Sequence, residues 1–266
     1  MKRIRLFSML AAVMLLAGGM AAGQSEKSGA VVVDTVLVGW DNPKGDIKIP
    51  DGVTDIAEDV FANCKDITRV IIPASVVNIN KGAFYKCTAL RIVEIQGNGL
   101  EIIGEGAFNG DTALISIALP KSVLSIGSYA FNDCTALATL VIPENVLGIG
   151  RYAFNNCRIL TTMKIPDSVM TVGDHAFASC TGLRSLTIGL GITRLEAWTF
   201  EKCVSLLKVT IPDNVTAING SVFFGCDKLM IVNTSDKWRE GGNSFDAMTA
   251  DMLKRDRDYW TYTRQK

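Results

Sequence analysis

Cysteine is the residue type in this chain with the widest chemical scope, because its thiol can form disulfides, bind metals or attack substrates. There are seven cysteines: Cys64, Cys87, Cys134, Cys157, Cys180, Cys203 and Cys226. Each stands three residues after a phenylalanine, and successive cysteines are 23 residues apart except between Cys87 and Cys134. Such regular spacing indicates that the cysteines occupy one recurring structural position.

Cysteines in successive coils of a repeat would lie side by side and point the same way. A disulfide needs Cβ atoms about 3.8 Å apart and turned toward each other, whereas parallel strands are about 4.8 Å apart. A metal needs thiolates that converge on it, which a one-sided row does not provide. We therefore predict a ladder of reduced, buried thiols and no metal site. A disulfide is the alternative, and Cys134 with Cys157 is where it would form.

His175 is the only histidine, so a Ser-His-Asp or Cys-His hydrolase would have to use it. It stands two residues before Phe177, in a position that Tyr129, Tyr152 and Trp198 occupy in neighbouring repeats. We predict a stacked, partly exposed aromatic column; a strip that grips a partner is the alternative. The sequence predicts no catalytic residue and no cofactor, so the protein is not expected to be an enzyme.

The phenylalanines reveal the internal repeat that must position these residues. They recur at intervals of 23 residues, with one interval of 24, at Phe61, Phe84, Phe108, Phe131, Phe154, Phe177, Phe200 and Phe223. A fixed period in this range is typical of solenoids, whose coils each contact only their neighbours. We assign eight repeats to residues 49–233.

The segment Ile142–Lys164, together with the strand segment that leads into it, shows the plan of one repeat. Leu137–Pro143, of the form Leu-x-x-Leu-x-Ile-Pro, predicts a short strand that ends at its proline. Gly150 predicts a turn with positive φ. The stretch Arg151–Cys157 has room for about two helical turns. In the third repeat, Ile95–Gly99 carries an extra residue and predicts a bulge or surface loop, and Asp111 replaces the cysteine.

The full pattern, Leu-x-x-Leu-x-Ile-Pro-x-x-Val-x-x-Ile-Gly-x-x-Ala-Phe-x-x-Cys-x-x-Leu, resembles the BspA-like, or treponemal-type, bacterial leucine-rich repeat. The resemblance implies an α/β solenoid with a parallel sheet on the concave side, short helical segments on the convex side and a cap at each end. It also implies a surface or secreted protein that attaches to host proteins or other cells.

The two ends of the chain lie outside the repeat. Residues 1–23 have a basic start, an apolar centre and small residues before a polar stretch, which is the layout of a signal peptide. Its removal leaves 24 basic and 27 acidic residues, so no charge excess favours nucleic acid, and no membrane span is expected. Residues 24–48 are interpreted as a linker and N-terminal cap, with one strand at Val31–Val38, and residues 234–266 as a C-terminal cap and tail.

The outward positions of the predicted strands are the main candidate for a binding surface, because solenoids present extended concave faces to partners. The candidate residues are Arg69, Ile71, Ile92, Glu94, Ala118, Thr139, Val141, Thr162, Lys164 and Lys208. The aromatic column of Tyr129, Tyr152, His175 and Trp198 is the second candidate. We expect an exported adhesion module that binds a host or cell-surface protein. The alternative is a periplasmic module that self-associates or holds an apolar ligand along Ile71, Ile92, Ala118 and Val141.

Overall fold

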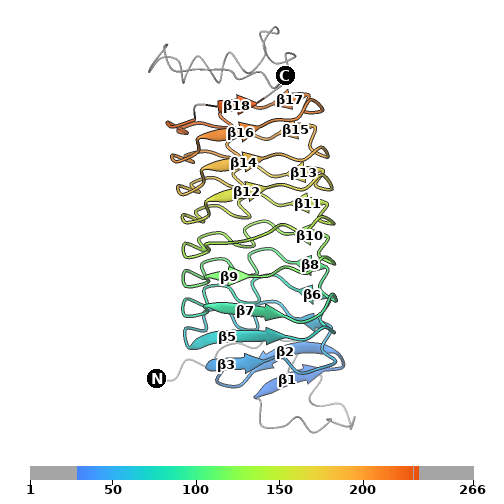
Figure 1. Ribbon diagram of the computed structural model, residues 1–266. Helices are drawn as coiled ribbons and strands as arrows, with labels where there is room; N and C mark the ends of the chain where they lie inside the picture. The colour runs from blue at the N-terminus through green and yellow to red at the C-terminus, as the bar shows by residue number, and fades with distance from the viewer. Residues whose placement is uncertain (1–28, 230, 234–266) are drawn as a thin grey trace.

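The computed structural model describes residues 29–229 and the backbone of 231–233. They form an elongated stack of coils in which the chain winds from the N-terminal end to the C-terminal end (Figure 1). The predicted signal peptide, residues 1–23, and the predicted C-terminal cap, residues 234–266, lie outside the described residues. Most coils contribute two short strands and one turn segment, so strands line two sides of the stack and turns build the third.

The first sheet runs along one side of the stack, and we call that side the strand face. One parallel ladder consists of β3 (Gly45–Lys48), β5 (Ile67–Ile72), β7 (Ile92–Ile95) and β9 (Ser116–Ile117). A second consists of β12 (Thr162–Lys164), β14 (Ser185–Thr187), β16 (Lys208–Thr210) and β18 (Ile231–Asn233). Between the two ladders, Thr139 makes a single bridge to Ser116. From β5 on, these strands lie within the segments of Leu-x-x-Leu-x-Ile pattern for which the sequence predicted strands.

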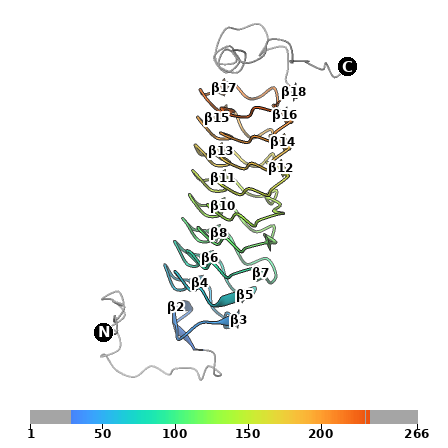
Figure 2. The ribbon, with the colours of Figure 1, turned by 90° about the vertical axis from the view of Figure 1, so that its left-hand side faces the viewer.

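The second sheet lies on the opposite side of the stack (Figure 2). Its main part is β1 (Ala30–Val33), β2 (Val36–Trp40), β4 (Asp55–Ile56), β6 (Asn78–Ile79), β8 (Ile102–Ile103), β10 (Ser125–Ile126), β11 (Gly148–Ile149) and β13 (Thr171–Val172). A separate pair, β15 (Arg194–Leu195) and β17 (Ala217–Ile218), continues toward the C-terminal end. Each two-residue strand after β2 ends on a buried aliphatic residue that faces the core.

The N-terminal end is closed by a β-hairpin rather than by the single strand predicted at Val31–Val38. Strands β1 and β2 pair antiparallel around a turn in which Asp34 has a φ of 55°. Strand β2 then pairs in parallel with β4, so the hairpin joins the second sheet. The ring of Trp40 lies 5.6 Å from that of Phe61, and it covers the first phenylalanine of the core.

The core contains two parallel ladders of side chains. The eight phenylalanines are fully buried, and neighbouring rings stack with centroids 5.0–5.5 Å apart. Three residues after the phenylalanine, the thiols of Cys87, Cys134, Cys157, Cys180, Cys203 and Cys226 each donate a weak hydrogen bond to a phenylalanine carbonyl of the preceding coil. Cys157 Sγ, for example, donates to Phe131 O at 3.3 Å. The repeat therefore keeps phenylalanine and cysteine for packing between coils.

The predicted helical segments are wrong, because the described residues contain no helix. The amide of Phe154 donates to Ala176 O of the next coil at 2.7 Å, and the amide of Tyr152 donates to Asp174 O at 3.1 Å. A helix would direct these amides to carbonyls four residues earlier in the same coil. The residues two before and two after each phenylalanine also have positive φ, which an α-helix excludes. We call this side of the stack the turn face.

The positive φ predicted at Gly150 is also wrong, since Gly150, Gly104, Gly127 and Gly173 all lack it. Glycine occurs there for a different reason. A Cβ on Gly150 would collide with Ser128 N, and one on Gly127 would lie 2.7 Å from Glu105 N. Adjacent coils thus approach so closely at this corner that their backbones leave no room for a side chain.

The third coil accommodates its extra residue in an exposed surface turn, Gln96–Asn98, directly after β7. Asp111, in the cysteine position, is fully buried. Its Oδ1 accepts a hydrogen bond from Cys87 N at 2.7 Å, whereas its Oδ2 has no hydrogen-bond partner among the described residues. Burial raises the pKa of this carboxyl well above its ordinary value.

Candidate interaction surfaces

The strand face carries two columns of outward side chains. Parallel pairing aligns Arg69 with Ile92 and Ser116, and Ile71 with Glu94. Beyond the break in the sheet, it aligns Thr162 with Ser185 and Lys208, and Lys164 with Thr187. The predicted strand-face residues that are exposed are Ile92, Glu94, Ala118, Thr139, Val141, Thr162, Lys164 and Lys208, whereas Arg69 and Ile71 are half-buried. All ten lie on the outer side of their strand segments.

An exposed apolar patch occupies the middle of this face. Val141 has 79% of its surface exposed, and Ile92 has 46%. Ile115 is 39% exposed on the same strand segment as Ala118, and its backbone is hydrogen-bonded to Arg91 and Ala138 of the adjoining coils. We define the apolar patch as Ile92, Ile115, Ala118 and Val141. The sequence prediction missed Ile115. It took alternate residues of this strand segment, Ser116 and Ala118, as outward, and Ile115 stands one residue before them.

The charged side chains around the apolar patch are mutually paired. Arg69 forms an ion pair with Glu94, and its Nη1 lies 3.8 Å from Asp46 Oδ2. Lys164 Nζ lies 3.0 Å from Glu144 Oε1. The hydrogen bonds to these carboxylates raise the pKa values of Arg69 and Lys164. Exposed ion pairs such as these are screened by solvent and contribute little to stability.

The aromatic column forms on the turn face. Ring centroids are 5.0 Å apart between Tyr129 and Tyr152, 4.5 Å between Tyr152 and His175, and 5.3 Å between His175 and Trp198. The first three side chains are half-buried, and Trp198, at the C-terminal end of the column, is 43% exposed. The predicted stacking is therefore present, with a narrow edge of each ring left at the surface.

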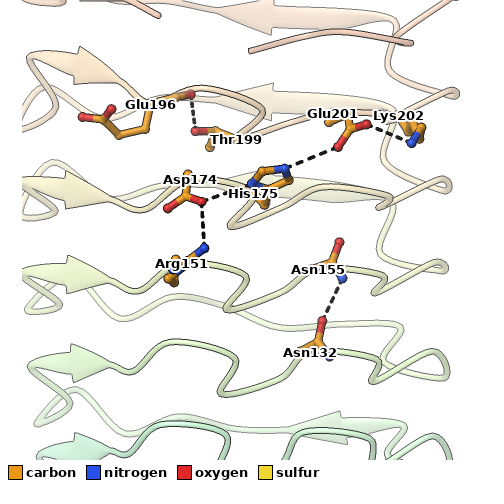
Figure 3. Close-up of polar contacts among 9 residues, drawn as sticks. All are labelled: Asn132, Arg151, Asn155, Asp174, His175, Glu196, Thr199, Glu201 and Lys202. Carbon is orange, nitrogen blue, oxygen red and sulfur yellow. Dashed lines mark hydrogen bonds and ion pairs between the residues drawn. The ribbon is translucent and has the colours of Figure 1, made fainter. Parts of the chain in front are cut away.

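His175 lies between two carboxylates (Figure 3). Its Nδ1 is 3.2 Å from Asp174 Oδ2, and its Nε2 is 3.7 Å from Glu201 Oε2. Arg151 and Lys202 pair with those carboxylates in turn, at 3.5 and 2.9 Å. Within the described part of the chain, no serine, threonine or cysteine is hydrogen-bonded to the imidazole, so it lacks the partner of a nucleophile–base pair. The imidazole is held as a rung of the column.

Within the described part of the chain, the structure assigns no disulfide to the cysteines. Burial raises the pKa of Cys180 to about 12 and those of Cys134 and Cys157 well above their ordinary value. These thiols are protonated at neutral pH and are poor nucleophiles. Across residues 29–229, no group of three His, Cys, Asp or Glu side chains is placed to hold a metal ion.

No helix within the described residues has the length and apolar character needed to cross a membrane.

The stacked parallel strands, with a phenylalanine ladder inside, define a leucine-rich repeat solenoid. The model of the BspA type leucine-rich repeat region matches residues 44–161 and 101–230. The chain belongs to that family.

Solved structures with the same fold include the T. pallidum leucine-rich repeat protein. It is 24% identical over 78% of this chain and 91% of its own, with a TM-score of 0.55. A leucine-rich repeat protein from Eubacterium ventriosum is 25% identical, with a TM-score of 0.52, over 71% of this chain and 54% of its own. A leucine-rich cell surface protein from Faecalibacterium prausnitzii is 24% identical, with a TM-score of 0.50, over 83% and 78%. Comparison with curated proteins gives no match.

Proposed function

We propose that the chain is an exported, non-enzymatic module that binds a protein on host or neighbouring cells through its strand face. The observation that carries this proposal is the apolar patch, and above all the 79% exposure of Val141. A contiguous apolar surface rimmed by polar residues is typical of protein interaction sites. Here the rim consists of the Arg69–Glu94 pair on one side and Thr162 with Lys164 on the other.

Export is part of the proposal. It is supported by the signal-peptide pattern of residues 1–23, followed by the linker and cap at 24–48, the repeats at 49–233 and the C-terminal segment at 234–266. The printed description of the F. prausnitzii structure as a cell surface protein is consistent with this location. A role without catalysis is supported by the stacking of His175, the only histidine, between Tyr152 and Trp198.

A charge placed on the apolar patch tests the proposal. Val141→Glu should fold normally, because this side chain is already exposed, and should weaken adhesion to host-cell surfaces by about ten-fold or more, since an interface buries an unpaired charge at high cost. The matched control is Met170→Glu. Met170 is 59% exposed beside β13 of the second sheet, so its variant adds the same charge away from the strand face.

The measurement is binding of labelled protein to immobilised host extracellular proteins and to intact cells, together with solution mass by light scattering. Loss of adhesion in Val141→Glu alone supports the proposal. If Val141→Glu instead turns an oligomer into a monomer while adhesion persists, the patch is a self-association surface. If neither property changes, the strand face is not the binding site.

A further inference from the structure

The aromatic column stops at Tyr129, although the turn that carries it continues toward the N-terminal end. The same position holds Asp59, Gly82 and Gly106 in the three preceding coils, with φ values of 57°, 59° and 59°. A depression of about 360 Å³ lies here, lined by Tyr129, Asp59, Lys81, Tyr85, Glu105 and Asn109. We call this depression the notch.

The notch has the thickness of one additional ring of the column. At Gly106, a Cβ would meet nothing closer than Asn109 Cβ at 3.7 Å, which is an ordinary contact, so this level is open. At Gly82, a Cβ would collide with Asp59 Oδ1, so the Asp59 carboxylate already lies over that level. The other face of the Tyr129 ring is covered by Tyr152. The open space beside Gly106 thus lies between the uncovered face of the Tyr129 ring and the Asp59 carboxylate.

The charges around the notch favour a cation. Lys81 Nζ lies 3.7 Å from Glu105 Oε1, so these two side chains offset each other. The Asp59 carboxylate has no hydrogen-bond or ion-pair partner within residues 29–229. Among the lining residues, one negative charge therefore remains beside the aromatic face, while Lys86 Nζ lies 5.0 Å from the ring of Tyr85 at the wall of the notch. An exposed tyrosine face also attracts cations through its quadrupole.

Two coils away, a guanidinium and a carboxylate already lie beside a tyrosine of the column, although both faces of that tyrosine are covered by Tyr129 and His175. The Arg151 guanidinium carbon lies 5.4 Å from the centroid of the Tyr152 ring, and Arg151 Nη2 lies 3.5 Å from Asp174 Oδ2. A guanidinium, a tyrosine of the column and a carboxylate are thus compatible with the geometry of the turn face. At the notch, the tyrosine and the carboxylate are present without the guanidinium.

We propose that the notch binds an arginine side chain of a protein partner, with the guanidinium on the uncovered face of Tyr129 and beside the Asp59 carboxylate. Guanidinium is planar, permanently charged and weakly hydrated, so it stacks on aromatic rings more readily than an ammonium group does. The notch is on the turn face, so this site is separate from the strand face, and either can fail without the other.

The probe for the test is N-acetyl-L-arginine methylamide, titrated into the folded chain while the amide signals of Gly82 and Gly106 are followed by NMR. The neutral control ligand is the citrulline analogue, which has the same shape without the charge. We expect saturable shifts with the arginine probe and affinity weaker by about ten-fold or more with citrulline. Equal binding of the two probes would overturn the proposal, as would stronger shifts with a neutral sugar such as methyl glucoside.

Gly106→Tyr provides the matched variant. It completes the column with a residue that the neighbouring coil already accepts, since Tyr129 has a φ of 58° against 59° for Gly106. This variant should fold and lose binding of the arginine probe. Ser221→Tyr is the control, because it adds the same ring beyond Trp198, where φ is 62°, and should bind as the parent chain does.

Asp59→Asn keeps the shape of the notch and removes its charge, so it should weaken binding of the arginine probe several-fold. If Gly106→Tyr fails to fold, as judged by circular dichroism, this variant and Tyr129→Leu decide the question. Unchanged affinity in Asp59→Asn and Tyr129→Leu would show that the arginine probe binds elsewhere.

Discussion

The phenylalanine ladder and the aromatic column stand two residues apart in the same coils, yet they differ in how strictly they are filled. The ladder has phenylalanine in all eight positions, whereas the column position holds Asp59, Gly82, Gly106, Tyr129, Tyr152, His175, Trp198 and Ser221. The backbone of the column position is nevertheless uniform, with φ between 53° and 62° in every coil. The turn is therefore fixed by hydrogen bonds between coils and by the buried ring, which leaves the column side chain free to vary.

The phenylalanine ladder is part of the scaffold, whereas the aromatic column and the strand face are candidate binding surfaces. Rings of the ladder are fully buried and contact a ring in each adjoining coil, so any change there affects three coils. Residues of the column and of the strand face reach solvent, and there the coils differ from one another. The residues that differ between coils at these two surfaces are therefore the candidates for partner binding.

The largest expected effect comes from breaking the ladder. Phe154→Ala should reduce the free energy of unfolding by about 3–5 kcal/mol, because it removes a buried ring and leaves a cavity between Phe131 and Phe177. Tyr152→Ala, two residues earlier, should cost only about 0.5–1.5 kcal/mol, since Tyr152 is half-buried. Urea unfolding followed by circular dichroism measures both. Equal losses would contradict the distinction between ladder and column.

An intermediate effect is expected at the glycine corner. Gly150→Ala places a Cβ against the backbone of Ser128, so the coils must separate, at a cost of about 1–3 kcal/mol. Gly220→Ala is the matched control, because a Cβ there meets no atom within 4 Å. The control should change the unfolding free energy by less than about 0.5 kcal/mol. A tolerated Gly150→Ala would show that this glycine serves another purpose.

The last effect is small at low pH, grows as pH rises and concerns Asp111, the one gap in the cysteine ladder. Because burial raises the pKa of Asp111 in the folded state, that state binds a proton which the unfolded chain releases above pH about 4. Stability should then fall as pH rises from there toward the folded-state pKa. Asp111→Cys removes this loss, so its advantage should grow between pH 4.5 and 7.5 and reach about 1–3 kcal/mol.

The control for Asp111→Cys is Asp66→Asn, which removes an exposed carboxyl of the preceding repeats. It should show little dependence on pH in the same unfolding experiments. A constant advantage for Asp111→Cys at both pH values would mean that packing, and not ionisation, separates aspartate from cysteine at this position.

The period of the phenylalanines was sufficient to predict the solenoid and its coil length. The short strands followed from the Leu-x-x-Leu-x-Ile-Pro pattern, and their parallel sheet was implied by the family resemblance. The structure of the turn segment was not predictable in the same way. The seven residues around Ala153 and Phe154 are compatible with helical turns in sequence. Only the hydrogen bonds to the next coil and the positive φ values of Tyr152 and Asn156 exclude a helix. The reason for Gly150 was equally hidden, since it depends on the backbone of the preceding coil.

The outward positions of the strand face followed from alternation along each strand, whereas Ile115 and the notch did not. Ile115 is exposed because its neighbours Arg91 and Ala138 leave it uncovered. The signal for the notch was present in the sequence, as two glycines where four later coils have aromatic rings. Reading it required knowing that this position has positive φ in every coil, a conformation that glycine adopts without strain and that Tyr129 and Tyr152 also adopt here.

The most direct test of the proposed binding role is a side-by-side adhesion measurement on Val141→Glu and Met170→Glu, with each variant shown to be folded. The proposal predicts that Val141→Glu loses about ten-fold or more of its affinity for host-cell surface protein while Met170→Glu keeps the parent affinity. Loss of adhesion in Met170→Glu with full adhesion in Val141→Glu would contradict it and assign binding to the second sheet.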